Sequence, residues 1–257
     1  MTSLRFQDNV AIVTGGCQGV GRGCVDVLVE NGGKVVVFDI KDELGATMIP
    51  KGPGEIKYIH CDVTKEDEVK KAIDLTVQHF GKLDCLVNNV GTLQGAYSVD
   101  ELSVESFREL LETNLLSNFT MSKYALPYLR KSKGCVVNIS SIAANSAAKN
   151  ISTYCATKGG VKALTKALAI DEAKHGVRVN SLAPGAVDTV YLREKVPAEQ
   201  REYLEKCHTL GRLAQPREIG KACLFLAVDA TFTTGEELMC TGGAEIGYGV
   251  KDPNSLY

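Results

Sequence analysis

The sequence has no large excess of either charge and no long apolar run, and each absence excludes a class of protein. It carries 29 basic and 31 acidic side chains, for a net charge of −2. No basic surface of the kind that binds nucleic acid or an anionic membrane is therefore expected. No apolar stretch reaches the length that crosses a bilayer, and the first eight residues lack the apolar core of a secretory signal. We expect a cytoplasmic protein without nucleic-acid or membrane partners.

Paired cysteines are also absent. The nine cysteines are scattered without a Cys-x-x-Cys pair, and their odd number disfavours a disulfide framework. The four histidines lie far apart and lack the spacing of metal ligands. We expect most cysteines to be small buried apolar residues and the histidines to be structural or on the surface. The sequence predicts no metal site.

Apolar, β-branched segments alternate with helical patterns along the whole chain, without a linker or an internal repeat. Runs of Val and Ile without polar alternation are typical of strands that are buried on both faces. Strands are predicted at residues 10–13, 34–38, 56–59, 84–87, 135–139, 177–182 and 237–240. Helices are predicted at residues 20–31, 66–80, 103–130, 153–175 and 216–228. The alternation indicates one α/β domain over residues 1–257: a Rossmann-type, doubly wound, seven-stranded and mostly parallel sheet with helices on both faces.

Two segments depart from this alternation. Residues 187–210 carry charges and a proline without a strand pattern, and we expect them to form a helical flap over the substrate. The tail at residues 242–257 is rich in glycine and too poor in apolar residues to form a further core element. Tyr248 in this tail is a candidate for reaching the substrate pocket of a neighbouring subunit.

A glycine-rich segment follows the first predicted strand and leads into a helix. It reads Thr14-Gly15-Gly16-Cys17-Gln18-Gly19-Val20-Gly21. Glycine permits a tight turn and a close approach of backbone N–H groups to phosphate oxygens, and a helix N-terminus attracts anions. Such a string alone is weak evidence, because many are ordinary loops. Its place between a strand and a helix favours a dinucleotide site that includes Gly15, Gln18, Gly19, Val20 and Gly21.

Asp39 ends the second predicted strand, eighteen residues after Gly21. A carboxylate at this place can accept hydrogen bonds from the ribose hydroxyls of adenosine, and it would repel a 2′-phosphate. Asp39 therefore favours NAD over NADP as the cofactor. The alternative is an Asp at a strand end that only faces solvent.

Tyr154 and Lys158 are four residues apart on a predicted helix and therefore lie on one face of it. Tyr191 and Lys195 have the same spacing, but only Tyr154 has a serine, Ser141, thirteen residues earlier at the end of a strand. Ligands of such sheets bind at the carboxyl ends of the strands. The sequence therefore points to Ser141, Tyr154 and Lys158 as the chemical centre.

These residue types suit the oxidation of an alcohol, in which a hydroxyl proton is removed as hydride leaves carbon. A free Tyr, with a pKa of about 10, is a poor base at neutral pH. A cation at ~4 Å in an effective dielectric of ~20 supplies about 4 kcal/mol, which corresponds to a shift of about three pKa units. Lys158 is expected to lower the pKa of Tyr154, which then acts as the general base, while Ser141 donates a hydrogen bond to the substrate oxygen.

The order and spacing of these motifs resemble those of the short-chain dehydrogenases/reductases, from the glycine segment to the closing Thr241-Gly242-Gly243. Asn88-Asn89-Val90-Gly91 is similar to the family's N-N-A-G segment, with Val90 in place of Ala. Asp62-Val63 is similar to its adenine-binding pair, although an Asp before Thr64 is also typical of a turn or a helix cap. The resemblance implies further cofactor contacts from Asp62, Val63, Asn89, Gly91, Tyr154, Lys158, Pro184, Gly185, Val187 and Thr189.

The resemblance also adds Asn114 to the chemical centre. An amide in an otherwise apolar helix is costly unless it has partners, and in the family this residue bends the helix and holds a water that connects the lysine to solvent. NADP enzymes of the family tend to carry a base where this chain has Gln18 or Ile40, which again favours NAD, although Lys41 lies nearby. The implied catalytic residues are Asn114, Ser141, Tyr154 and Lys158.

Several stretches, above all residues 241–249, resemble a subgroup of the family that oxidises 17β-hydroxysteroids or sugars such as L-fucose. The resemblance implies a homotetramer that oxidises a secondary alcohol or a sugar hemiacetal with NAD. The substrate side departs from that subgroup, because Leu93 stands in place of a histidine and Ala148 in place of a glutamine. The predicted substrate residues are Leu93, Ser141, Ala148, Tyr154 and Tyr248.

Two alternatives stay open at this point. An NADPH-dependent reductase of carbonyl or 3-oxoacyl substrates would share the fold, and Asp39 argues against it. A non-catalytic NAD-sensing protein would also keep the fold, but it would not need Asn114, Ser141, Tyr154 and Lys158 together.

Overall fold

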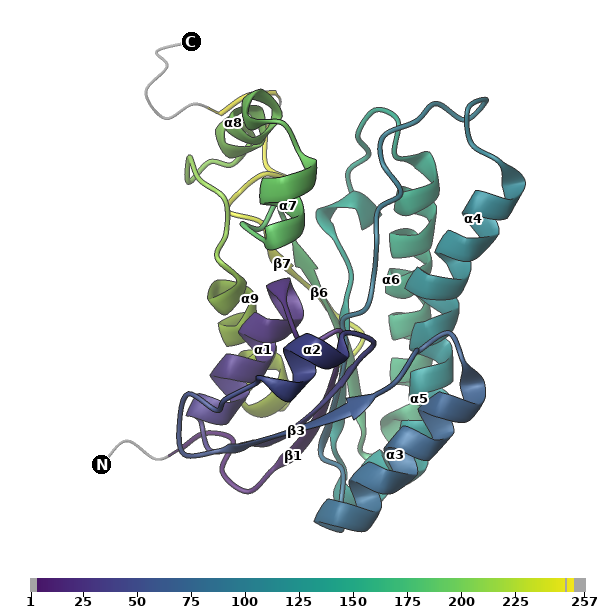
Figure 1. The fold of residues 1–257 in the computed structure, drawn as a ribbon, viewed down its shortest axis with the longest axis vertical. Coiled ribbons are helices and arrows are strands. Elements are labelled where there is room, and N and C mark those ends of the chain that lie inside the picture. Colours follow the sequence, from purple (N-terminus) through teal and green to yellow (C-terminus); the bar gives the residue numbers. More distant parts are fainter. Residues whose placement is uncertain (1–3, 248, 252–257) are drawn as a thin grey trace.

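The computed structural model describes residues 4–247 and 249–251, which form one parallel sheet covered by helices on both faces (Figure 1). The strand order is β3-β2-β1-β4-β5-β6-β7, and every neighbouring pair is parallel. The strands are β1 Val10–Thr14, β2 Lys34–Asp39, β3 Glu55–His60, β4 Cys85–Asn88, β5 Cys135–Ile139, β6 Arg178–Pro184 and β7 Glu237–Cys240. The predicted Rossmann-type fold is confirmed, with a sheet that is entirely parallel.

Helices α1 and α9 lie side by side on one face of the sheet, and α3, α5 and α6 cover the other (Figure 1). The α-helices are α1 Gly19–Glu30, α2 Asp42–Ala46, α3 Glu66–Phe80, α4 Val104–Leu111, α5 Ser117–Ser132, α6 Ser152–Glu172, α7 Val190–Lys195, α8 Ala198–Cys207 and α9 Pro216–Leu224. Shorter turns are the π-helical η1 Glu112–Leu116 and η4 Phe225–Asp229 and the 3-10 helices η2 Ile142–Ala144 and η3 Ala173–His175. Because apolar side chains leave the strands on both faces, each layer has its own buried core.

Strands β1, β2, β4 and β5 are almost completely buried, as their Val-rich sequences predict. Strand β3 is different, because most of its residues are only half-buried and its two ends are exposed. The prediction of a strand buried on both faces is wrong for residues 56–59, and it is wrong for residues 237–240, of which only Glu237 is buried. The reason is that β3 and β7 form the two edges of the sheet.

The order in which the chain adds strands to the sheet reverses at β1. From β1 the chain moves outward through β2 to β3, and it then returns to β4 on the other side of β1. Val13 lies opposite Val37 on β2 and Val87 on β4. The glycine segment after β1 and the Asn segment after β4 therefore leave the sheet side by side, at the crevice where such folds bind ligands.

Glycines bring α1 and α9 into direct backbone contact. A Cβ on Gly23 would lie 2.1 Å from the carbonyl oxygen of Pro216, and a Cβ on Gly220 would lie 2.2 Å from that of Gly23. No larger residue fits at either place without moving a helix. This contact fixes α1, the helix that follows the glycine segment, against α9.

Two parts of the structure differ from the sequence-based prediction. The predicted helix at residues 103–130 consists of α4, the π-helical turn η1 and α5. The short helix α2 was not predicted, because five residues carry too little periodicity to be recognised. Residues 187–210 contain α7 and α8, in agreement with the predicted helical segment.

None of the described helices is long and apolar enough to cross a membrane. Across the same residues, no group of three or more His, Cys, Asp or Glu could hold a metal ion. All nine cysteines are free, and six of them are buried.

Candidate active site

The glycine segment forms a tight turn between β1 and α1. Gly15 and Gly19 have positive φ angles of 63° and 56°, which favour glycine. A Cβ on Gly21 would lie 2.2 Å from the carbonyl oxygen of Gly15, so any other residue would open the turn. Thr189, from the segment after β6, comes within 3.4 Å of where a Cβ on Gly19 would be. A close backbone approach and a free helix N-terminus fit the pyrophosphate of a dinucleotide.

Asp39 lies beside this turn and is only 7% exposed, so the solvent-facing alternative is wrong. Its Oδ2 accepts a hydrogen bond from the N–H of Cys17 at 3.0 Å, and its Oδ1 accepts one from the N–H of Lys41 at 3.1 Å. The Lys41 ammonium donates to Oε1 of Gln18 at 2.9 Å. Burial, together with the Asp39 charge, raises the pKa of the Cys17 thiol to about 12. Asp39 therefore orders the glycine turn as well as placing a negative charge at its edge.

Asn89 joins the ends of β1 and β4. Its backbone N–H donates to Oγ1 of Thr14 at 2.9 Å, and its Nδ2 donates to the carbonyl oxygen of Thr14 at 2.8 Å. Val90, in place of the family's Ala, packs against the core on the α3 face of the sheet. Asp62 accepts hydrogen bonds from the N–H and hydroxyl of Thr64 at 2.9 and 2.7 Å, so it caps a turn at the end of β3.

Ser141, Tyr154 and Lys158 come together at the carboxyl end of β5. Ser141 begins the 3-10 helix η2, and its Oγ accepts from the N–H of Ala143 at 3.1 Å. Tyr154 and Lys158 lie on one face of α6, with the lysine Nζ 5.8 Å from the centre of the tyrosine ring. The same ammonium donates to the carbonyl oxygen of Ile139 at 2.9 Å. Three groups that can bind an oxygen and move a proton thus share one place.

Burial controls the ionisation of both groups on α6. It raises the pKa of the Tyr154 phenol, an effect that a hydrogen bond with Ser141 opposes. It lowers the pKa of Lys158 to about 8. In the protein alone desolvation dominates the pKa of Tyr154, and the Lys158 ammonium donates to the Ile139 carbonyl, so a lowering of the tyrosine pKa by Lys158 stays a prediction.

Asn114 is completely buried in the π-helical turn η1, and its side chain binds the loop after β4. Its Oδ1 accepts from the N–H of Thr92 at 2.8 Å, and its Nδ2 donates to the Thr92 carbonyl at 2.9 Å and to Oγ1 of Thr157 at 3.2 Å. Gly91 lies between this amide and Lys158, since a Cβ there would come within 3.0 Å of the lysine Nζ. Asn114 thus fixes the loop that borders the lysine.

Asn118 was not recognised from the sequence. Its Nδ2 donates to the backbone carbonyl of Asn114 at 2.8 Å. A π-helical turn shifts hydrogen bonding from i+4 to i+5 and so changes which carbonyls have backbone partners. Asn118 is 3% exposed, and its own Oδ1 has no hydrogen-bond partner within the described residues. Only the position of an amide four residues after Asn114 could have indicated this contact.

His208 anchors the segment that follows β6. Its Nδ1 donates to the carbonyl of Leu204 at 2.6 Å, and its Nε2 accepts from the N–H of Ala186 at 3.1 Å. A Cβ on Gly185 would lie 2.6 Å from that Nε2, so Gly185 makes room for the imidazole. His208 is a buried structural histidine that ties α8 to the Pro184-Gly185 segment.

Only some of the predicted substrate residues lie close together in the structure. The hydroxyl of Tyr191 on α7 donates to the carbonyl of Leu93 at 3.1 Å, which links the helical segment 187–210 to the loop after β4. Tyr191 also contributes to the raised pKa of Tyr154, so this tyrosine, whose spacing to Lys195 matches that of Tyr154 and Lys158, lies near the site. Ala148 is exposed, and Tyr248 lies outside the described residues.

The residues implied to contact the nicotinamide lie in the segment that follows β6. Val187 is 6% exposed and forms a bridge with Ala214, and Thr189 caps α7 by accepting from the N–H of Leu192. Thr189 lies beside the glycine turn, close to where a Cβ on Gly19 would be. The residues present therefore fit a dinucleotide that extends from Asp39 to the site of Tyr154.

A parallel Rossmann sheet with a glycine turn after β1 and a Ser, Tyr and Lys centre at the carboxyl end of β5 defines a short-chain dehydrogenase/reductase. A family model described as enoyl-(acyl carrier protein) reductase matches residues 15–245. The chain belongs to the short-chain dehydrogenase/reductase family, whose members use NAD or NADP.

Comparison with individual relatives indicates the kind of reaction within this family. The chain is 44% identical to L-fucose dehydrogenase of Bos taurus, with 96% of this chain and 93% of that protein covered. It is 45% identical to L-fucose dehydrogenase of Rattus norvegicus, with 98% and 94% covered. The solved structure of aldohexose dehydrogenase from Thermoplasma acidophilum, in its ligand-free form, matches with a TM-score of 0.86 at 33% identity and covers 98% of both chains. The protein is thus a short-chain dehydrogenase that acts on CH–OH donors, with a small-molecule alcohol or sugar as substrate.

Proposed function

We propose that the protein oxidises a sugar with NAD as the hydride acceptor, and that L-fucose is the first substrate to test. The observation that carries this proposal is the half-buried Tyr154 beside Ser141 and Lys158 in a chain 44% identical to an L-fucose dehydrogenase. The anomeric hydroxyl of such a sugar is a CH–OH donor. A 17β-hydroxysteroid is the other substrate that the sequence suggested.

Each residue of the centre has a defined role in this proposal. When bound, the dinucleotide supplies the nicotinamide carbon that accepts the hydride. Tyr154 removes the proton from the substrate hydroxyl, and Ser141 donates a hydrogen bond that holds the substrate oxygen beside it. The Lys158 ammonium favours the phenolate of Tyr154, and Asn114 keeps the Thr92 loop against the lysine.

NAD is proposed over NADP because of Asp39. Its carboxylate lies at the edge of the glycine turn, where it can accept hydrogen bonds from ribose hydroxyls and repel a 2′-phosphate. Lys41, the cation near this place, donates to Oε1 of Gln18 at 2.9 Å. A reductase of acyl or carbonyl substrates is a second candidate, favoured by the description of the matching family model.

The proposal includes a homotetramer and a cytoplasmic location. Leu116 and Phe119 on the α5 side are 45% and 47% exposed, and with neighbours on α4 and α6 they line an apolar hollow. Exposed apolar surface of this kind is typical of subunit contacts. Nine free cysteines suit a reducing compartment.

The test is the initial rate of NADH formation from NAD, with L-fucose and with estradiol compared on one preparation. We expect turnover of L-fucose, and Tyr154→Phe is expected to lower kcat by at least about a thousandfold while NADH binding stays unchanged. Tyr128→Phe, whose hydroxyl binds Asp74 away from the site, is the matched control. Turnover of estradiol alone would replace the sugar with a steroid, and full activity of Tyr154→Phe would refute its role as the base.

A further inference from the structure

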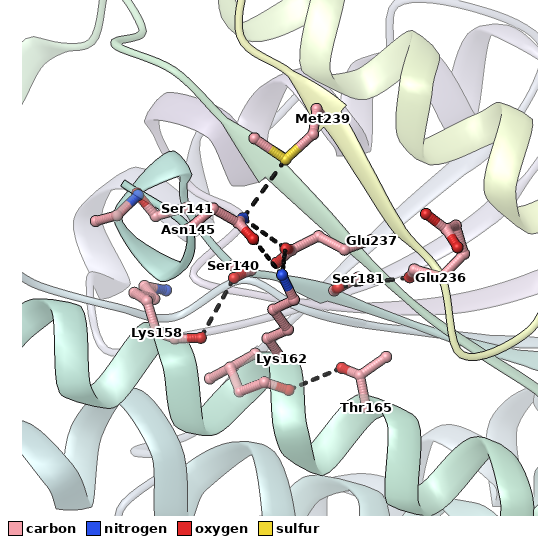
Figure 2. Close-up of polar contacts among 12 residues, drawn as sticks. Ser140, Ser141, Asn145, Lys158, Lys162, Thr165, Ser181, Glu236, Glu237 and Met239 are labelled. Carbon is pink, nitrogen blue, oxygen red and sulfur yellow. Dashed lines mark hydrogen bonds and ion pairs between the residues drawn. The ribbon is translucent and has the colours of Figure 1, made fainter. Parts of the chain in front are cut away.

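A polar cluster joins the segment that follows Ser141 to α6 and β7 (Figure 2). It consists of Asn145, Lys162 and Glu237. The Lys162 ammonium lies 3.1 Å from Oε2 of Glu237 and also donates to Oδ1 of Asn145. Nδ2 of Asn145 donates to the same Oε2 at 2.6 Å. Each of the three side chains therefore contacts the other two.

Glu237 is the buried member of the cluster, with a side chain that is 6% exposed. A buried carboxylate is costly unless it has hydrogen-bond donors and a counter-charge. Its Oε1 has no hydrogen-bond partner within the described residues, so Lys162 and Asn145 are the groups that stabilise it. The amide of Asn145 also faces Sδ of Met239 at 3.5 Å. Both ends of the Asn145 carboxamide are thus held, and the side chain cannot rotate without breaking a contact to a charge.

Asn145 ends the 3-10 helix that Ser141 begins. Ser141 caps this helix through the N–H of Ala143, and its carbonyl accepts from Ala144 at 2.9 Å. The N–H of Asn145 donates to the carbonyl of Ile142 at 2.9 Å. Because overlapping local hydrogen bonds connect the residues of this turn, we expect a movement of Asn145 to displace Ser141.

Helix α6 supports both sides of the chemical centre. Tyr154, Lys158 and Lys162 follow one another at intervals of four residues and therefore lie on one face of the helix. Tyr154 projects from this face directly, whereas Ser141 is connected to it through Asn145 and Lys162. The cluster thus holds the turn that carries Ser141 against the helix that carries Tyr154.

We propose that Glu237 and Lys162 are positioning residues for the dehydrogenase reaction, which act through Asn145 to hold the Ser141 hydroxyl beside Tyr154. This inference rests on the proposed function for its effect on turnover. Its structural effect is a more mobile turn at residues 142–146 when the side-chain contacts of Asn145 are removed. This effect can be measured without any substrate.

The first variant is Asn145→Ala. It removes the hydrogen bonds of the Asn145 side chain to Glu237 and Lys162 and leaves the ion pair between Lys162 and Glu237 in place. We expect kcat/KM for the alcohol to fall about tenfold. The Kd for NADH and the thermal midpoint are expected to stay close to those of the wild type, while backbone amide hydrogen exchange becomes faster at residues 142–146. Ser146→Ala, at the next exposed position, is the matched control and is expected to change none of these quantities.

A second pair of variants separates the charge of Glu237 from its hydrogen bond. Glu237→Gln keeps an oxygen that accepts from Asn145, so turnover and exchange are expected to stay near wild-type values. Glu237→Ala removes that acceptor and is expected to behave like Asn145→Ala. If Glu237→Ala does not fold, Asn145→Ala still decides the question, because it leaves the buried carboxylate paired.

Wild-type exchange at residues 142–146 in Asn145→Ala would overturn the proposal. A loss of turnover without faster exchange would also overturn it, because Asn145 would then act by contacting the substrate. If the wild type oxidises no alcohol while hydrogen exchange at residues 142–146 becomes faster in Asn145→Ala, the proposed function is wrong. The inference that Asn145 holds this turn in place is then still supported.

Discussion

Burial gives Lys158 a pKa of about 8, below its ordinary value of 10.5. Below pH 8 both the folded and the unfolded chain are protonated at this residue, and the folded state carries the full cost of the buried ammonium. Between the two values the unfolded chain binds more protons, so the stability that this residue contributes rises with pH. The charge that the reaction needs is therefore held at a cost to the stability of the fold.

Lys158→Met is expected to raise the free energy of unfolding of the protein without cofactor by about 3 kcal/mol below pH 8. The difference from the wild type should shrink as the pH rises through that window. The measurement is urea unfolding of both proteins at several pH values between about 7 and 10. The exposed Lys131→Met serves as the control, and a pH-independent difference for Lys158→Met would contradict the assigned pKa direction.

Asp39→Ala removes the charge that repels a 2′-phosphate. The ratio of kcat/KM with NAD to that with NADP is expected to fall about tenfold to a hundredfold, because juxtaposed like charges cost several kcal/mol. Part of the loss with NAD itself should come from the turn, since the N–H of Cys17 loses its acceptor. Asp42→Ala, whose carboxylate binds Tyr58 and His60, is the control. An unchanged cofactor preference would refute the role assigned to Asp39.

Single residues were predictable where a motif orders them along the chain. Ser141, Tyr154 and Lys158 could be found from their spacing at the end of a strand and on a helix, and the structure brings them together. Glu237 could not be found in this way, because its partner Asn145 is far away in sequence and neither residue belongs to a local motif. Their contact depends on how the edge strand β7 lies beside η2, which is a property of the assembled sheet.

At the scale of helices and strands, the periodic segments were predictable and the irregular turns were not. The apolar pattern of residues 103–130 is continuous, so it predicts one helix. The structure widens this helix at Asn114, where the buried amide binds the backbone of Thr92 and the Asn114 carbonyl binds Asn118. Those partners lie outside any helical repeat, so periodicity carries no sign of them.

The close contact between α1 and α9 gives a prediction for stability. Gly23→Ala places a Cβ 2.1 Å from the Pro216 carbonyl, and the free energy of unfolding is expected to fall by about 3 kcal/mol or more. Gly159→Ala is the control on α6, where no described atom other than those of the neighbouring residues and the helix backbone lies within 4 Å of the added Cβ. It is expected to raise the stability of the subunit by about 0.5–1 kcal/mol. Thermal unfolding measures both, and wild-type stability of Gly23→Ala would mean that the two helices can move apart freely.

At the scale of the whole molecule, the sheet was predictable because each strand is short, apolar and followed by a helical pattern. The apolar hollow between α4, α5 and α6 was not, because the same apolar pattern suits both a core and a subunit contact. Its lining residues are Leu111, Leu115, Leu116, Phe119, Gly160 and Leu164. Only the packed structure shows that part of this face stays exposed.

Phe119→Asp is expected to disrupt the proposed tetramer, because a carboxylate cannot be buried in an apolar contact without a partner. Light scattering should show four 27.6 kDa chains for the wild type and a smaller assembly for the variant. Phe232→Asp, at a fully exposed position, is the control. A wild-type monomer, or an intact tetramer in Phe119→Asp, would contradict the assignment of this face.

The backbone contact of Gly23 with Pro216 and Gly220 also has a consequence for synthesis of the chain. The N-terminal β1–α1 unit leaves the ribosome long before residues 216–224 are made, so the side of α1 that carries Gly23 stays uncovered during translation. Contacts between residues so distant in sequence also slow folding. The nascent chain is therefore expected to need chaperones that cover this side of α1 until α9 emerges from the ribosome. Because α9 holds α1, dinucleotide binding should begin only after residues 216–224 have been made.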